Sequence, residues 1–247
     1  NKIIEPHEMA TIMSEKSLII YDQKIWAISG WQDELRTQNV FNKIKTARAD
    51  SPLLKENTEE FNETLNFTKE EHGAFYPTTT GILLAGNNKA LKEIPYSEIK
   101  YVRYYEDGRY HPYEWKGNLI EVADACFTQL KSEIQQKELG FGLFHEFIED
   151  YSEVVLRELL INAIVHRDYS RQQVIEIRKY PTYLEIESPG MFPEGVDETN
   201  YLRKTNPRNP NIIDVFRSIK YAEKAGSGFD KIFADLLSKE KKCQYRP

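Results

Sequence analysis

Cysteine is scarce in this chain: only Cys126 and Cys243 occur in 247 residues. Two cysteines so far apart in sequence give neither a disulfide framework nor a cysteine-based zinc site. The histidines also lack the paired spacing of metal ligands, which argues against a metal hydrolase; they are His7, His72, His111, His145 and His166. We therefore expect a reducing, cytoplasmic setting.

Long hydrophobic runs are missing too. No stretch approaches the roughly 18–20 apolar residues that a membrane helix needs, and charge near the N-terminus replaces the apolar run of a signal peptide. The hydrophobic fraction of 40% and the charged fraction of 29% are those of an ordinary globular protein, with enough residues for one large domain or two modest ones. The chain opens on Asn1, and we expect it to be part of a longer protein.

Two catalytic signatures of nucleotide enzymes are absent. The sequence contains no G-x-x-x-x-G-K-[ST] phosphate loop, which leaves helicase activity unsupported. The run His166-Arg167-Asp168 resembles the catalytic loop of protein kinases, but Gln173 stands where that loop needs an asparagine. A DFG motif and a kinase-type glycine-rich loop are missing as well, so we exclude a kinase.

Positive charge is in deficit overall but not everywhere. The net charge is -6, whereas residues 201–247 carry +6, which leaves -12 for the first 200 residues. The basic segment is either a solvated helix or a phosphate-binding surface. Because no helix-turn-helix or zinc-finger pattern is present, we expect this chain alone to bind DNA weakly and without sequence selectivity.

Hydrophobic patterning predicts an α+β protein. Residues 78–85 form a β-branched and apolar run ended by Gly86-Asn87-Asn88, which predicts a strand and a turn. Apolar residues at three- and four-residue spacing predict a helix over 118–136. The remaining expected elements are short strands, or one strand and a helix start, at 18–20 and 25–28, helices at 41–45, within 53–67, at 212–220 and 225–238, and strands at 99–105, 174–178 and 183–187.

A helix predicted over 153–166 is apolar around almost its whole circumference, which is typical of a buried helix. Its polar exceptions Glu158, Asn162 and His166 are four residues apart and share one face. Buried polar groups need partners. Either they line a pocket, with Glu158 orienting a water and the Asn162 carbonyl oxygen binding Mg²⁺, or they form a polar network with neighbouring elements.

Two glycine segments favour the pocket. Ser188-Pro189-Gly190 directly follows a predicted strand, where the absence of a Cβ lets a ligand approach the backbone. Gly226-Ser227-Gly228 opens a predicted helix, whose free N–H groups suit a phosphate. Either segment alone is more often a turn or a helix cap. Both segments follow a Glu-x-x-x-Asn helix along the chain, and the three features in this order indicate a pocket more specifically than either glycine segment alone.

Here the sequence resembles a known family. The runs that carry the likeness are 156–170 (LRELLINAIVHRDYS), 184–193 (LEIESPGMFP), 208–210 (RNP) and 223–228 (EKAGSG), with a further likeness at 77–86. They are similar to bacterial RecG-like C-terminal proteins and transcriptional regulators. The core of that family is a GHKL-type nucleotide-binding domain, shared with gyrase B, sensor histidine kinases and MutL. An AlbA-like (Schlafen-type) DNA-binding domain typically precedes this region, and a winged helix often follows.

The resemblance implies a fold and a division of the chain. Residues 116–247 would form a GHKL-type α/β sandwich, with a mixed sheet and helices on one face. Residues 1–115 would form a smaller mixed α/β segment in front of it.

The resemblance also implies roles for individual residues. Glu158 would be the general base and Asn162 the Mg²⁺ ligand. Ser188 to Gly190 would form the adenine-side box, and Gly226, Ser227 and Gly228 the phosphate-side box. His166 would contact phosphate or cap its own helix.

Two departures from the family pattern concern the adenine side. Ser188 stands where GHKL ATPases have an aspartate that accepts from the adenine amino group, and the second glycine near Phe192 is missing. Glu187 could replace that aspartate if it turned inward. These departures predict weak nucleotide binding, a different ligand, or a pocket with a structural role only.

The sequence thus predicts a module that binds ATP or ADP with Mg²⁺ within a bacterial DNA-binding transcriptional regulator, with DNA contacted through flanking domains. Hydrolysis and homodimerisation stay open. The alternative is a non-catalytic interaction or dimerisation module with a vestigial pocket.

Overall fold

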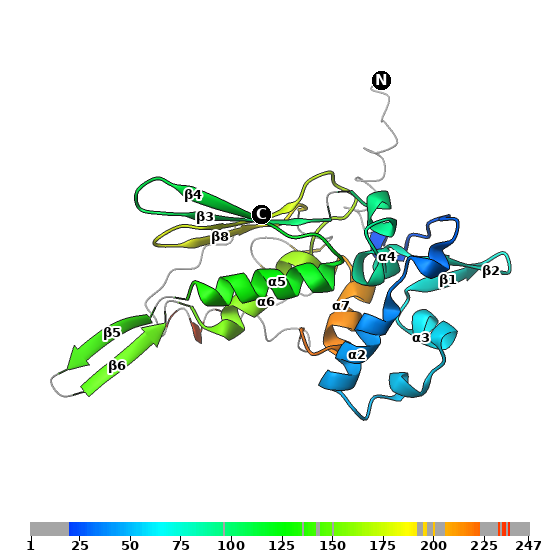
Figure 1. The fold of residues 1–247 in the computed structure, drawn as a ribbon, viewed down its shortest axis with the longest axis horizontal. Helices are drawn as coiled ribbons and strands as arrows, with labels where there is room; N and C mark the ends of the chain where they lie inside the picture. Colours follow the sequence, from blue (N-terminus) through cyan, green and yellow to red (C-terminus); the bar gives the residue numbers. More distant parts are fainter. Residues whose placement is uncertain are drawn as a thin grey trace, which may run out of the picture.

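The computed structural model describes residues 20–95, 97–134, 136–141, 144–149, 151–191, 195–196, 200 and 206–222, and also 232, 234–235 and 237. Its main body is a four-stranded sheet with two long helices on one face, next to a group of shorter helices and a small hairpin (Figure 1). An α+β fold with a mixed sheet is confirmed.

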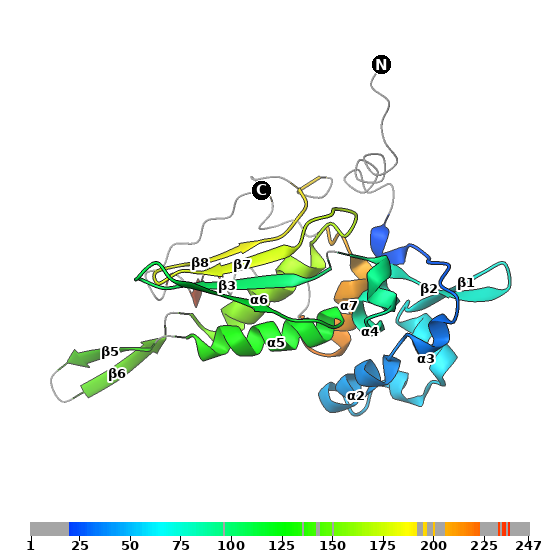
Figure 2. The same cartoon turned by 45° about the horizontal axis from the view of Figure 1, so that its top comes forward.

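The sheet has the order β4 (Tyr110–Glu114), β3 (Ile99–Tyr104), β7 (Ile175–Lys179), β8 (Leu184–Glu187). The central pair, β3 and β7, is parallel, and both outer pairs are antiparallel. Figure 2 shows α5 (Leu119–Ser132) and α6 (Glu153–Val165) beneath this sheet. The side chains that face the helices are buried: Ile99, Tyr101, Ile175 and Ile177.

Both long helices begin at a residue whose side chain caps the first turn. The Asn118 side chain accepts hydrogen bonds from the N–H groups of Ile120 and Glu121, each at 3.1 Å, and the Glu121 carboxylate accepts from the Asn118 N–H at 3.3 Å. Ser152 caps α6 by accepting from the Val155 N–H at 3.3 Å. Between the helices, the hairpin of β5 (Gln136–Phe141) and β6 (Phe144–Glu149) projects from the body (Figure 1), which the sequence analysis did not predict.

The strand predicted over 78–85 is wrong: this segment is the helix α4 (Thr79–Ala85). Thr78 is its N-cap, and its hydroxyl accepts from the Gly81 N–H at 3.1 Å. Every residue of α4 is buried. A helix with no exposed face has no polar positions to show its 3.6-residue period, so the apolar run looked like a strand.

The rest of the N-terminal half is partly as predicted. The helical fragment at 41–45 lies within α2 (Thr37–Ala47), and the helix expected within 53–67 is split into η3 (Pro52–Lys55) and α3 (Thr58–Thr64). The hairpin of β1 (Thr68–Glu71) and β2 (Ala74–Pro77) follows, and η4 (Ala90–Glu93) comes after α4.

The strands proposed at 18–20 and 25–28 are not formed within the described residues, which start at 20. There the chain has the short helices η1 (Tyr21–Gln23) and η2 (Trp31–Asp33) and an isolated bridge between Ile25 and Thr78.

Two long-range ties join the N-terminal half to the rest. The Asp22 carboxylate, fully buried, accepts from the N–H groups of Asn211 and Ile212 at 2.7 and 3.3 Å, at the start of α7 (Pro210–Ser218). Lys43 on α2 donates to Asp124 on α5 at 2.6 Å. The division after residue 115 stays a prediction, and the sheet crosses it, because β3 pairs with β7. No helix among the described residues is long and apolar enough to cross a membrane.

Candidate functional site

The three polar side chains predicted to share one face, called the polar stripe from here on, lie between the middle of α6 and its C-cap. Glu158, Asn162 and His166 are all half-buried. The Asn162 amide nitrogen donates to Glu158 Oε1 at 3.3 Å, so the two side chains are joined along the helix. Within the described part of the chain, no hydrogen bond to Asn162 Oδ1 is found, and this amide oxygen is the atom that a ligand or cation could use.

His166 closes the helix, and its N–H donates to the Asn162 carbonyl at 3.0 Å. Burial lowers the pKa of its imidazole to about 4, and the nearby Arg208 guanidinium lowers it further. The ring is therefore neutral at physiological pH, with one nitrogen as donor and one as acceptor.

The loop after β8 is attached to the end of α6. The Ser188 hydroxyl donates to the Ala163 carbonyl at 2.7 Å, and the Pro189 carbonyl accepts from the Asp168 N–H at 2.7 Å. The structure thus brings the Ser188–Gly190 segment to the same end of the helix that carries Asn162 and His166. Because the only proton of the Ser188 hydroxyl is used on the helix, its remaining lone pairs can only accept.

Glu187 lies on the other face of the sheet. Its side chain is 66% exposed and accepts from Arg178 at 3.1 Å. The inward turn that would let Glu187 replace the missing aspartate is absent, because Leu184 and Ile186 take the inward positions of β8. The alternation of these apolar residues was a signal in the sequence that could have shown this.

The second glycine segment cannot be placed. Gly226, Ser227 and Gly228, like Phe192 and residues 201–205, lie outside the described residues. Most of the predicted helix at 225–238 lies outside them as well.

A buried polar cluster, for which the sequence predicted no role, lies behind the loop. Its members are Asp168 and Asn209, both with fully buried side chains, and Arg208, whose side chain is 5% exposed. Arg208 donates to the Met191 carbonyl at 2.6 Å and lies 3.4 Å from Asp168 Oδ2. Asn209 donates to the Val165 and Arg167 carbonyls at 2.9 and 2.8 Å, which satisfies the end of α6. The family runs at 156–170 and 208–210, which contain these residues, were the signal for this cluster.

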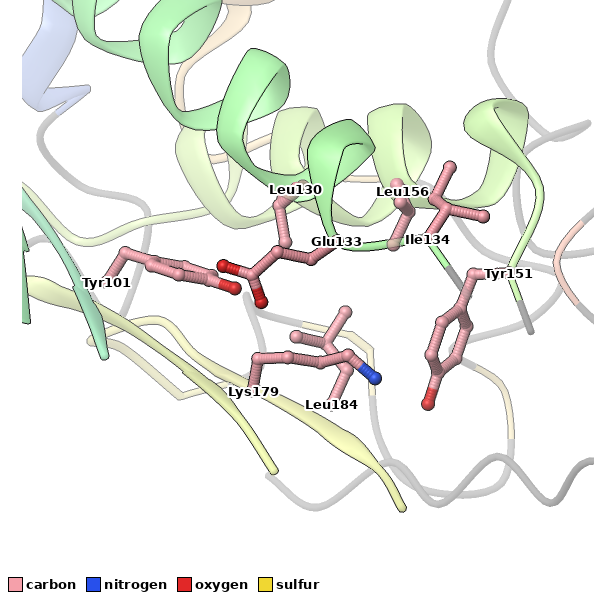
Figure 3. A pocket seen from close by; sticks show the side chains of 8 residues that line it. All are labelled: Tyr101, Leu130, Glu133, Ile134, Tyr151, Leu156, Lys179 and Leu184. Carbon is pink, nitrogen blue, oxygen red and sulfur yellow. The ribbon is translucent and has the colours of Figure 1, made fainter. Parts of the chain in front are cut away.

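A small pocket lies at the opposite end of α6, between the helices and the sheet (Figure 3). Its charged members already have partners: Glu133 accepts from Gln129 at 2.8 Å and pairs with Arg103 at 3.2 Å, and the Lys179 ammonium lies 5.0 Å from the Tyr151 ring centre. The lining residues are Tyr101, Leu130, Glu133, Ile134, Tyr151, Leu156, Lys179 and Leu184. This pocket contains no member of the polar stripe. Among the described residues, no group of three or more His, Cys, Asp or Glu could hold a metal ion.

A family model matches the C-terminal part of the chain. Residues 172–245 match the model of the family described as "Putative ATP-dependent DNA helicase recG C-terminal". The resemblance to a RecG-like, ATPase-like family is thereby confirmed for this part of the chain. The matched stretch includes Ser188 and Gly190 and excludes Glu158 and Asn162.

The fold is also found in a solved structure. The chain is similar to the crystal structure of the DIP2311 protein from Corynebacterium diphtheriae, with a TM-score of 0.70, 17% identity and coverage of 98% of this chain. At this identity the likeness shows the fold alone. This chain spans 47% of the length of that protein. No curated protein matches the sequence.

Proposed function

We propose that the end of α6 and the loop after β8 bind an adenine nucleotide with Mg²⁺. The observation that carries this proposal is the attachment of Ser188 to Ala163, which joins the glycine loop to the helix that bears Glu158 and Asn162. The match of residues 172–245 to an ATPase-like family supports the same function.

The residues fit such a ligand in their chemistry. Mg²⁺ prefers oxygen ligands and keeps several waters, so one amide oxygen from Asn162 is a sufficient protein ligand. The Ser188 hydroxyl accepts where the adenine amino group donates, although it is neutral and weaker than a carboxylate. Bound Mg²⁺ would neutralise phosphate charge, while the neutral His166 can donate to a phosphate oxygen.

Calorimetry with ATP and ADP, with and without Mg²⁺, tests binding. We expect modest affinity that depends on Mg²⁺ and is lost in Asn162→Ala. Asn42→Ala is the control, because Asn42 is an exposed amide on α2 that lies outside the proposed site. Absence of heat with both nucleotides, or equal binding by both variants, would reject the site.

Hydrolysis is a separate proposal, with Glu158 as the general base. Glu158→Gln should then abolish turnover and leave nucleotide affinity nearly intact, because the amide keeps the shape and loses the basic oxygen. Measured phosphate release equal to that of the parent protein would assign water activation to another group.

We also propose that the module belongs to a bacterial transcriptional regulator whose DNA contacts lie in other domains. Gel-shift titration in physiological salt should give only weak binding by this chain, around 10⁻⁴–10⁻⁶ M, that declines steeply as salt increases. Sequence-selective nanomolar binding would contradict this assignment.

The second candidate is an interaction module with a vestigial pocket. The hydrogen bond between Glu158 and Asn162 favours it, because each side chain already has a hydrogen-bond partner on the same helix. A stable complex with a second copy of the chain, combined with no nucleotide binding, would support this alternative.

A further inference from the structure

The buried cluster behind the loop has no role in the proposed nucleotide chemistry, yet it contacts the loop at several points. The Pro189 carbonyl is bonded to the Asp168 N–H at 2.7 Å, and the Met191 carbonyl to Arg208 at 2.6 Å. Between these bonds, Gly190 has a φ of +133°, and a Cβ there would lie 3.1 Å from Asp168 Cβ. The loop is therefore in close backbone contact with the cluster along Pro189 to Met191.

Asp168 organises the cluster from its centre. One carboxylate oxygen accepts from the N–H and the hydroxyl of Ser170 at 3.0 and 2.6 Å. The other lies 3.4 Å from both Arg171 and Arg208. The Asp168 and Arg208 side chains are both buried, so their interaction forms in a region of low dielectric, where charged hydrogen bonds are stronger than in water.

Arg208 and Asn209 connect this cluster to a second element. They directly precede α7, which begins at Pro210, and Asn209 also binds the carbonyls at the end of α6. The start of α7 is held in turn by Asp22, 189 residues earlier in the chain. Hydrogen bonds at both ends of the short segment 208–212 therefore connect the loop, through Arg208, to Asp22 in the N-terminal half.

We propose that Arg208 and Asp168 are positioning residues that clamp the 188–191 loop, and that Asp22 controls this clamp from the N-terminal half through α7. Because the clamp contacts backbone atoms of the loop, it fixes the position of Ser188 relative to Asn162. This inference rests on the proposed function for its consequence, since the loop it positions is the adenine side of that site. The state of the N-terminal half would thereby regulate nucleotide affinity.

Hydrogen exchange on the full chain tests the clamp without any ligand. The Asp168 amide is the direct probe, because its hydrogen is bonded to the Pro189 carbonyl. We expect Arg208→Lys, which keeps the charge and loses the forked geometry, to speed exchange at Asp168 by about tenfold or more. Amides in α5, such as those of Cys126 and Leu130, should keep their parental rates.

Asp22→Ala tests whether Asp22 acts on the clamp through α7. It should also speed hydrogen exchange at the Asp168 amide. The Asp22 carboxylate accepts from the N–H groups of Asn211 and Ile212 in α7, so any effect at Asp168 must pass through α7. The matched control is Lys43→Met, which breaks another tie between the two halves, the pair with Asp124. Lys43→Met should leave exchange at Asp168 unchanged.

Three results would overturn the clamp: an unchanged Asp168 amide in Arg208→Lys, an equal acceleration in Lys43→Met, or an equal acceleration in α5, which would indicate general destabilisation. If Asp22→Ala misfolds, Asp22→Asn replaces it, because one amide oxygen can still accept and a smaller effect in the same direction is expected.

Calorimetry with Mg²⁺ and ADP separates this inference from the proposed function. If the parent protein binds, Arg208→Lys should weaken binding by about tenfold, consistent with the loss of one charged hydrogen bond, and Lys43→Met should not. If the parent does not bind, the proposed function fails, and the exchange rate at Asp168 still decides whether the clamp exists.

Discussion

Asp22 is fully buried and His166 is half-buried, and the pKa values of these two ionisable side chains move in opposite directions for the same reason. Burial disfavours the charged form of each group. It raises the pKa of Asp22 to about 6, with the Asp214 carboxylate adding to the shift and the N–H groups of Asn211 and Ile212 opposing it. It lowers the pKa of His166 to about 4, with Arg208 adding to the shift.

The two shifts predict opposing effects on stability between pH 4 and 6. The folded protein binds the Asp22 proton more tightly than the unfolded chain, so this group stabilises the fold at low pH and loses its contribution as pH rises through about 6. Unfolding allows His166 to take up a proton, so its contribution is lost as pH falls from its ordinary 6.5 toward 4. Each effect is on the order of 3 kcal/mol over its full window.

Single substitutions should separate these two effects. Asp22→Asn removes the first titration, so the free energy of unfolding should then rise more steeply with pH from 4 to 6. In His166→Gln, the free energy of unfolding should instead rise less steeply with pH over the same range. Denaturant unfolding across this range measures both, and parallel pH profiles for the parent and the two variants would show that neither group titrates as argued.

Gly190 should tolerate no side chain. Its φ of +133° strains any other residue, and a Cβ would also press against Asp168 at 3.1 Å. Gly108 is a matched control, because its φ is +82° and nothing lies within 4 Å of an added Cβ. We expect Gly108→Ala to destabilise the protein by about 1 kcal/mol and Gly190→Ala by about 2–4 kcal/mol. Equal losses in thermal unfolding would mean that only the backbone conformation matters at Gly190.

At the scale of elements, helix starts in this protein are set by local side-chain caps. Asn118 and Asn57 form the same capping box, at α5 and at α3, but Asn118 is buried and Asn57 is exposed. Water can replace a lost cap only at the exposed site. Asn57→Ala should therefore reduce stability by about 0.5–1 kcal/mol, and Asn118→Ala by about 1–2 kcal/mol or more. A larger loss for Asn57→Ala in denaturant titrations would contradict this reasoning.

For the whole molecule, the sheet and the buried ties predict one cooperative unit. A fragment of residues 116–247 would lack β3 and β4, which exposes β7 as an unprotected edge, and would leave the start of α7 without Asp22. We expect this fragment to show no cooperative thermal transition, whereas the full chain should unfold in a single step. A fragment with a sharp transition of its own would support an independent domain beginning at residue 116.

The sequence by itself determined the elements whose signals are local. The apolar spacing predicted α5, and the apolar circumference predicted α6 together with its polar stripe. Three of the four strands in the main sheet were also predicted, because strand alternation and turn residues act over a few positions. The family runs predicted a site shared by this helix and the Ser188–Gly190 segment, and that site stays a prediction.

Only the tertiary structure decided the features that depend on distant partners. The apolar run at 79–85 is a helix because all of its sides are covered by other elements, and no local pattern records that. The cluster of Asp168, Arg208 and Asn209 forms between segments about 40 residues apart, and Asp22 reaches α7 across most of the chain. A buried carboxylate is stable only when such partners arrive, so its surroundings are fixed by long-range packing and not by its neighbours in sequence.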